Sequence, residues 1–106
     1  MTDEIALLYD EIQSLLDEPV AADPELLARL EHTLTEGYAR ALELEAESLR
    51  LERRIREVSA DVTAHERRGG ELAELAQRLS HSTRELGRLR AVLEALRARG
   101  SEIRAA

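Results

Sequence analysis

An unbroken heptad pattern constrains the fold of this chain more than any other feature of its sequence. Apolar or small residues recur at alternating spacings of three and four, at Leu27, Leu30, Leu34, Gly37, Ala41, Leu44, Ser48, Leu51, Ile55, Val58, Val62 and His65. This spacing places them on one stripe of an α-helix, in the a and d positions of a coiled coil. It predicts a long helix whose stripe packs against a second helix.

A second stripe of the same kind follows in a different phase. It consists of Leu72, Leu75, Leu79, Ser82, Leu86, Leu89, Leu93 and Leu96, continued more weakly by Gly100 and Ile103. The phase changes at the adjacent pair Gly69 and Gly70, and one uninterrupted helix would place Arg90 and Arg97 in the stripe. We therefore predict a turn at 68–70, where the chain reverses so that the two stripes pack as an antiparallel coiled-coil hairpin.

The position numbers of facing residues in such a hairpin have a constant sum, and a sum of 137 places the midpoint beside the two glycines. This register pairs Leu51 with Leu86 and Ser48 with Leu89, so that the serine meets a large residue. It also brings opposite charges together beside the stripes, in the pairs Asp61–Arg78, Arg54–Glu85, Arg68–Glu71, Glu45–Arg90 and Glu31–Arg104.

A third, shorter helix is predicted at the N-terminus. Its apolar face is formed by Ile5, Leu8, Ile12 and Leu15, with Tyr9 and Leu16 beside them. Pairs of acids recur every seven residues along the edge of this face, and residues 1–25 hold eight acids but no arginine. We expect this acidic helix to pack near the open end of the hairpin.

Two interpretations of these acids stay open. They are a solvated rim of the helix, or Glu4 or Glu11 contacts the cationic open end of the hairpin. The arginines expected at that end are Arg40, Arg97, Arg99 and Arg104.

Prolines and glycines set the predicted boundaries. Pro19 ends the first helical pattern, while Asp23 and Pro24 supply a capping carboxylate and a proline for the first turn of the next helix. We predict one all-α domain over 1–106, with helices at about 3–18, 24–67 and 71–99, a linker at 19–23, the turn at 68–70 and a frayed end at 100–106.

Side chains that carry out catalysis or bind metals do not converge in this pattern. His32, His65 and His81 fall on different helical positions, the chain has no cysteine, and no Glu-x-x-His pair or phosphate-binding glycine pattern occurs. We expect no enzyme activity, no catalytic residues, no cofactor and no metal.

No apolar run approaches the roughly 18 residues that a membrane-spanning helix needs. The N-terminus begins with acids, where a signal peptide would carry basic residues. We expect a cytoplasmic protein without a membrane span.

Two surfaces are candidates for binding a partner. The first is an apolar strip at spacings of four, four and three, away from the coiled-coil stripe, formed by Tyr38, Leu42, Ala46 and Leu49. It is either a contact with another protein, a second copy included, or it is covered by the N-terminal helix. The second surface is the hairpin tip, formed by Arg67, Arg68, Gly69 and Gly70, which could touch an acidic protein or a phosphate.

These observations predict a non-enzymatic coiled-coil protein–protein interaction module, acting as an adaptor, assembly factor or small chaperone, that self-associates, with a homodimer favoured. The alternative is a nucleic-acid-associated regulator that uses the arginines of the tip. Nucleic acid is the less favoured partner because acids alternate with the arginines and no aromatic side chain is available there to stack on bases.

Overall fold

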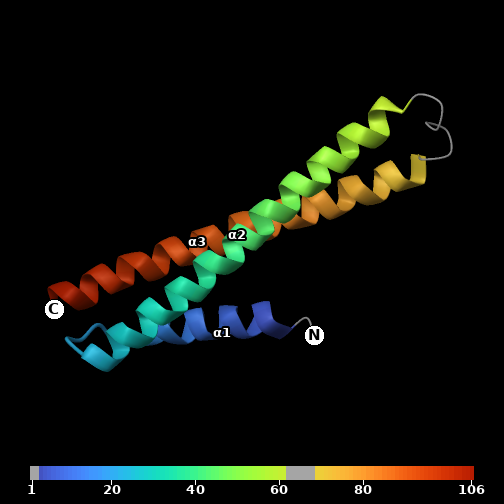
Figure 1. The fold of residues 1–106 in the computed structure, drawn as a ribbon. Helices are drawn as coiled ribbons and strands as arrows, with labels where there is room; N and C mark the ends of the chain where they lie inside the picture. Colours follow the sequence, from blue (N-terminus) through green and yellow to red (C-terminus); the bar gives the residue numbers. More distant parts are fainter. Residues whose placement is uncertain (1–2, 62–68) are drawn as a thin grey trace. The chain divides into compact units, whose positions relative to one another are not determined.

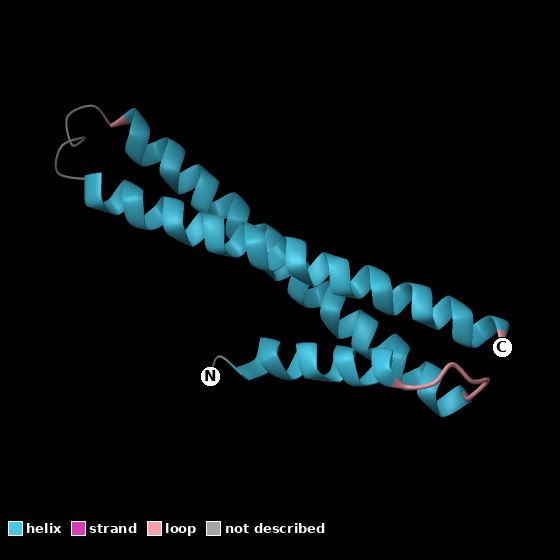
Figure 2. Cartoon of the chain, turned by 180° about the vertical axis from the view of Figure 1, so that it is seen from behind, coloured by secondary structure: helices cyan, strands magenta, loops and turns pink. Residues whose placement is uncertain are grey.

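The computed structural model describes residues 3–61 and 69–106 (Figure 1). It contains three helices, α1 (Asp3–Asp17), α2 (Pro24–Ala60) and α3 (Gly69–Ala105). No strand occurs among these residues, as the colours of Figure 2 show. The predicted all-α class with three helices is confirmed.

The start of α2 follows from a capping carboxylate. Asp23 Oδ1 accepts hydrogen bonds from the backbone N–H groups of Glu25 (3.0 Å) and Leu26 (3.4 Å), and the Asp23 carbonyl accepts the first helical bond from Leu27 (3.0 Å). Pro24 occupies the first helical position, where a missing N–H costs nothing. The cap explains why the chain becomes helical here after the linker.

The other end of α2 differs from the prediction. The helix ends at Ala60 and not near 67, with the Asp61 N–H donating to the Val58 carbonyl (3.2 Å) in a tightened last turn. The predicted stripe positions Val62 and His65 lie outside the described residues, as do Arg67 and Arg68 of the predicted tip.

The turn predicted at 68–70 is wrong for Gly69 and Gly70, which form the first turn of α3, while position 68 lies outside the described residues. Neither has a positive φ, so neither uses the left-handed conformation that makes glycine suited to turns. Glycine keeps its backbone N–H and can adopt helical φ and ψ, so it can form the first turn of a helix at a cost in conformational entropy. The helix also continues to Ala105, past the end predicted at 99, because Gly100 and Ile103 are buried.

The chain divides into two compact units. Unit 1 comprises Met1–Ala41 and Arg88–Ala106, and therefore contains α1, the first part of α2 and the last part of α3. Its fully buried side chains come from all three helices and include Ile12, Leu15, Leu30, Leu89, Leu93 and Leu96. This set confirms the apolar face predicted for α1 and the predicted stripe over the last turns of α3.

Polar contacts also join the three helices of unit 1. Arg29 of α2 pairs with Glu11 of α1 at 3.1 Å, and Arg104 of α3 pairs with Glu31 of α2 at 3.1 Å. The guanidinium carbon of Arg88 lies 4.7 Å from the centre of the Tyr9 ring, a cation–π contact between α3 and α1. The predicted Glu31–Arg104 pair is thus present.

Unit 2 comprises Leu42–Gly87, the last part of α2 and the first part of α3. Its core contains Leu51, Val58 and Leu75, with Ile55, Leu72 and Leu79 packed against it. Each of these residues belongs to one of the two predicted stripes. The stripes therefore meet each other, as the heptad pattern requires.

The facing residues of unit 2 correct the predicted register. Ser48 Oγ lies 2.9 Å from Ser82 Oγ, and the Ser82 hydroxyl donates a hydrogen bond to the Leu44 carbonyl at 3.3 Å. The position numbers of Ser48 and Ser82 add up to 130 and not to 137. The predicted pairing of Ser48 with Leu89 is therefore wrong. Burying two hydroxyls against each other satisfies both, whereas a hydroxyl buried against leucine would lose its hydrogen bond.

Facing residues in unit 1 also have position numbers that add up to 130. Gly37 lies directly against the Leu93 side chain, and a Cβ at Gly100 would lie 3.0 Å from Leu30 Cδ2. In each pair a glycine of one helix accommodates a leucine of the other. The predicted register is therefore displaced by seven residues, one heptad.

Candidate interaction surface

The apolar strip predicted on α2 is exposed in the structure. In unit 2, Leu42 is 66% exposed and Leu49 is 54% exposed, with Ala46 half-buried beside them. Tyr38, which belongs to unit 1, is 44% exposed. A single exposed leucine is ordinary on a protein surface, but these side chains follow one another along one side of α2.

The exposure follows from the geometry of α2. The a and d positions of this helix face the core, where Leu44, Leu51 and Val58 are buried. Leu42 and Leu49 each precede one of these buried leucines by two residues, which is about 200° around a helix of 3.6 residues per turn. The same helical period that buries one set therefore presents the other to solvent.

Covering by the N-terminal helix was the other possibility for this strip. The apolar face of α1 is instead used within unit 1, where Ile12 and Leu15 are buried almost completely. Leu42 and Leu49 belong to unit 2 and stay exposed.

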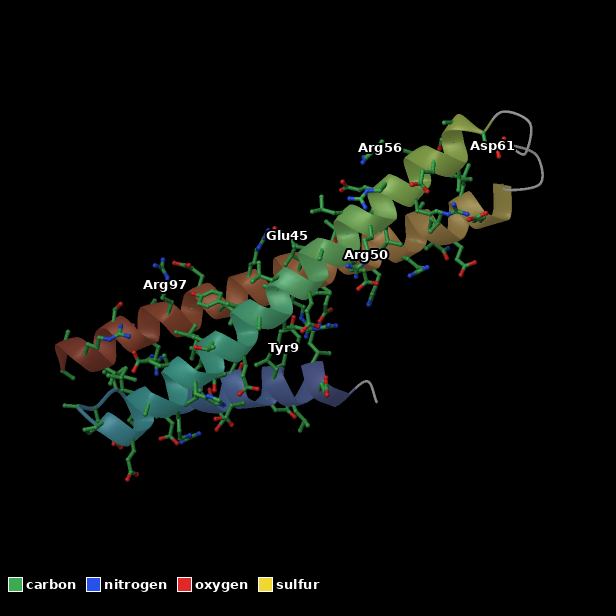
Figure 3. All side chains as sticks on the ribbon, viewed as in Figure 1. Tyr9, Glu45, Arg50, Arg56, Asp61 and Arg97 are labelled. Carbon is green, nitrogen blue, oxygen red and sulfur yellow. The ribbon has the colours of Figure 1, made fainter. Side chains whose placement is uncertain are left out.

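Charged side chains share the outer face of α2 with the two leucines. Figure 3 shows Glu45 and Arg56 projecting from one side of α2 and Arg50 projecting from another side. Arg53 and Arg56 are exposed, and Glu45 has an interaction within the chain. From the sequence, Glu45 was expected to pair with Arg90 beside the stripes, and the position of Glu45, Arg53 and Arg56 on the same face as the strip was not predicted.

A charged pair, Arg97 and Glu94, lies near Tyr38 in unit 1. Arg97 donates a hydrogen bond to Glu94 at 2.7 Å, and this bond together with the charge of Glu94 raises the pKa of Arg97. Arg97 therefore stays charged beside the phenol ring. This end of the strip has a polar rim.

The acids of α1 meet arginines, although not in the expected combination. Glu11 pairs with Arg29, which was not among the predicted arginines. Arg99, which was among them, donates to the backbone carbonyl of Glu18 at 2.8 Å, just after the end of α1. Arginine at the last carbonyls of a helix is favoured by hydrogen bonding and by the helix dipole.

Arg54 of unit 2 pairs with acids different from the one predicted. Arg54 donates to Glu71 at 2.8 Å and pairs with Glu57 at 3.5 Å, so its predicted pairing with Glu85 is wrong. The hydrogen bond from Arg54 to Glu71 is the largest cause that raises the pKa of Arg54. The change of partner follows from the change of register.

Metal-binding geometry is not found in the described part of the chain, where no three His, Asp or Glu side chains gather in a group that could hold an ion. His32 pairs with Glu36 one turn later on α2 at 2.9 Å. His81 lies at a shallow, open hollow beside Glu47, Glu74 and Arg78.

No helix among the described residues combines the length and the apolar character that crossing a membrane requires. No protein-family model matches the chain, and the comparisons with curated proteins and with solved structures found no match.

Proposed function

We propose that this chain is a non-enzymatic coiled-coil protein–protein interaction module that self-associates through the outer face of α2. Adaptor, assembly factor and small chaperone are the roles that such a module serves. The observation that carries the proposal is the exposure of Leu42 and Leu49 on one side of a helix whose opposite side is fully used by the core.

The coiled-coil part of the proposal rests on the contacts between α2 and α3. Within unit 2, Ser48 meets Ser82 while Arg54, further along α2, meets Glu71, which is earlier on α3. Position numbers that rise on one helix and fall on the other favour an antiparallel hairpin. We propose that α1 packs beside the open end of this hairpin, supported by the Arg99–Glu18 contact in unit 1.

The interaction proposal rests on the energetics of an exposed apolar strip. Large apolar side chains stabilise by roughly 1.5–3 kcal/mol each when they are buried completely. A hairpin with a single narrow stripe has few such side chains in its core, so burial of Leu42 and Leu49 against another protein adds appreciably to its stability. Exposed apolar patches on helices are a common sign of protein–protein contacts.

The test replaces both exposed leucines and measures the mass of the particle in solution. We expect Leu42→Gln with Leu49→Gln to retain helicity, since neither residue lies in the core, and to shift the protein toward monomer in light scattering. Leu7→Gln with Val20→Gln is the matched control, because both residues are also exposed and apolar, at 65% and 42%, but lie outside the strip. A wild-type protein that is monomeric at high micromolar concentration would contradict self-association.

The second candidate is the nucleic-acid-associated regulator. Arg50, Arg53 and Arg56 are exposed on α2, which favours contact with phosphates, while the arginines at 67 and 68 lie outside the described residues. Retention on DNA or RNA at physiological ionic strength, weakened by added salt and by Arg50→Glu, supports this candidate. Co-purification of one protein partner without retention on nucleic acid excludes it.

A further inference from the structure

We infer that the strip on α2 binds the α2 helix of a second copy in the antiparallel direction, with the two-fold axis beside Leu49. This inference rests on the proposed self-association and adds the direction, the centre and the charged pairs of the contact. It concerns the part of α2 in unit 2.

The order of residues on the outer face of α2 carries the inference. Glu45 lies four residues before Leu49 and Arg53 lies four residues after it, while Leu42 and Arg56 lie seven residues before and after. All five share one face of the helix, because their spacings of three and four follow the helical period. Glu52 lies on this face as well, three residues after Leu49, so the face carries one acid before Leu49 and two arginines and one acid after it.

A two-fold axis beside Leu49 converts this order into complementarity. It places Leu49 against Leu49 of the second copy. It also places Glu45 against Arg53 of the second copy, and this charged contact occurs twice by symmetry. Leu42 then lies beside Arg56 of the second copy, whose aliphatic stem can cover it while the guanidinium stays in water.

A parallel pairing of the same faces lacks this complementarity. It would place Glu45 against Glu45 and Arg53 against Arg53, and like charges opposite each other are destabilising. The leucines alone fit either direction. The charges therefore select the antiparallel one.

The interaction that Glu45 already has within the chain is compatible with this contact. A carboxylate has two oxygens and can accept hydrogen bonds from more than one donor. The second copy adds an arginine to this carboxylate, and Figure 3 shows the Glu45 side chain projecting from the same side of α2 as Arg56.

Single cysteines test the geometry directly, since the chain has no cysteine of its own. We expect Leu49→Cys to form a disulfide-linked dimer rapidly under mild oxidation, because this position meets itself at the axis. Leu42→Cys should form almost none, since in the antiparallel pair the two copies of position 42 are about 21 Å apart along the helix axis.

Each other pattern of crosslinking overturns the inference. Rapid crosslinking at both positions indicates a parallel pair, and crosslinking at Leu42 alone, or at neither, places the axis elsewhere. Light scattering on the unmodified protein distinguishes a failure of the antiparallel contact from a failure of self-association. A dimer that does not crosslink at Leu49→Cys contradicts the antiparallel contact alone, whereas a monomer contradicts the proposed self-association as well.

Charge reversal provides a second measurement that needs no crosslink. We expect Arg53→Glu to raise the dimer dissociation constant about tenfold, since two attractive pairs become repulsive, and Glu45→Arg with Arg53→Glu to restore it. Arg50→Glu is the matched control, because it makes the same charge change on the same helix but off this face. An equal effect of Arg50→Glu and Arg53→Glu, or no restoration in the double variant, overturns the inference.

Discussion

Gly37 is the position where a single methyl group has the most to disturb. It is buried in unit 1 on α2, and a Cβ at this position would overlap Leu93 Cδ2, with the Cγ and Cδ1 atoms at 3.3 Å. Leu93 is 1% exposed and cannot swing into solvent. Replacing Gly37 with alanine therefore overpacks the contact between α2 and α3.

Two effects of opposite sign determine how Gly37→Ala changes the free energy of unfolding. Alanine is favoured over glycine in a helix interior by about 1 kcal/mol, while overpacking a core costs typically 1–3 kcal/mol. We expect a net destabilisation of about 0–2 kcal/mol. Gly87→Ala is the matched control, since Gly87 is exposed on α3 with no atom within 4 Å of an added Cβ. The free energy of unfolding of Gly87→Ala should rise by about 1 kcal/mol, because only the higher helix propensity of alanine contributes.

Urea unfolding followed by circular dichroism at 222 nm measures both variants. The difference of about 1–3 kcal/mol between them isolates the overpacking. Leu93→Ala provides a further check, because in that background the methyl group at Gly37 has room and Gly37→Ala should become stabilising. If Gly37→Ala stabilises the wild type as much as Gly87→Ala does, Gly37 does not face Leu93 and the reasoning is refuted.

Three further predictions concern the cap, the docking of α1 and the register. Asp23→Ala should lower the free energy of unfolding by about 1 kcal/mol in urea denaturation, because it removes the acceptor of two N-terminal N–H groups of α2, whereas Asp23→Ser should retain most of the stability. Arg99→Met should accelerate amide hydrogen exchange in α1, since it keeps the aliphatic stem but removes the donor to the Glu18 carbonyl, and unchanged exchange would show that this hydrogen bond does not hold α1. Cysteines at Ser48 and Ser82 should crosslink within one chain, because the two hydroxyl oxygens are 2.9 Å apart, and a failure to crosslink in the folded protein would contradict the register.

The sequence by itself determined which residues of α3 enter the core. Every position of the predicted stripe is buried or half-buried, from Leu72 at one end to Ile103 at the other. A period of three and four specifies one side of a helix whatever packs against it. The cap of α2 and the end of α1 before Pro19 were also predictable, since both depend on residues close in sequence.

The buried face of α2 in unit 1 was predicted only in part. Leu30 is fully buried as expected, but Leu26 and Thr33 are buried while Leu27 and Leu34 are half-buried. In this unit α2 packs against α1 as well as α3, so its buried surface is wider than one stripe. A heptad pattern describes contact with one partner, and it does not reveal where a second helix docks.

The register between α2 and α3 was decided only by the tertiary structure. In an antiparallel pair, each a position of one helix faces a d position of the other. A displacement of seven residues keeps this arrangement, so both alignments satisfy the heptad pattern equally well. The charges could not separate them either, because arginine is long enough to reach acids in either alignment; Arg104 finds Glu31 in both.

Packing of individual side chains separates the two alignments. In the structure the Ser48 hydroxyl meets that of Ser82, and Gly37 accommodates Leu93. In the predicted register each serine would lie against a large apolar side chain, and Gly37 would face Gly100 across a void. Unsatisfied hydroxyls and voids each cost free energy that a pattern of apolar and polar letters does not record, so the choice depends on side-chain volumes and hydrogen bonds in three dimensions.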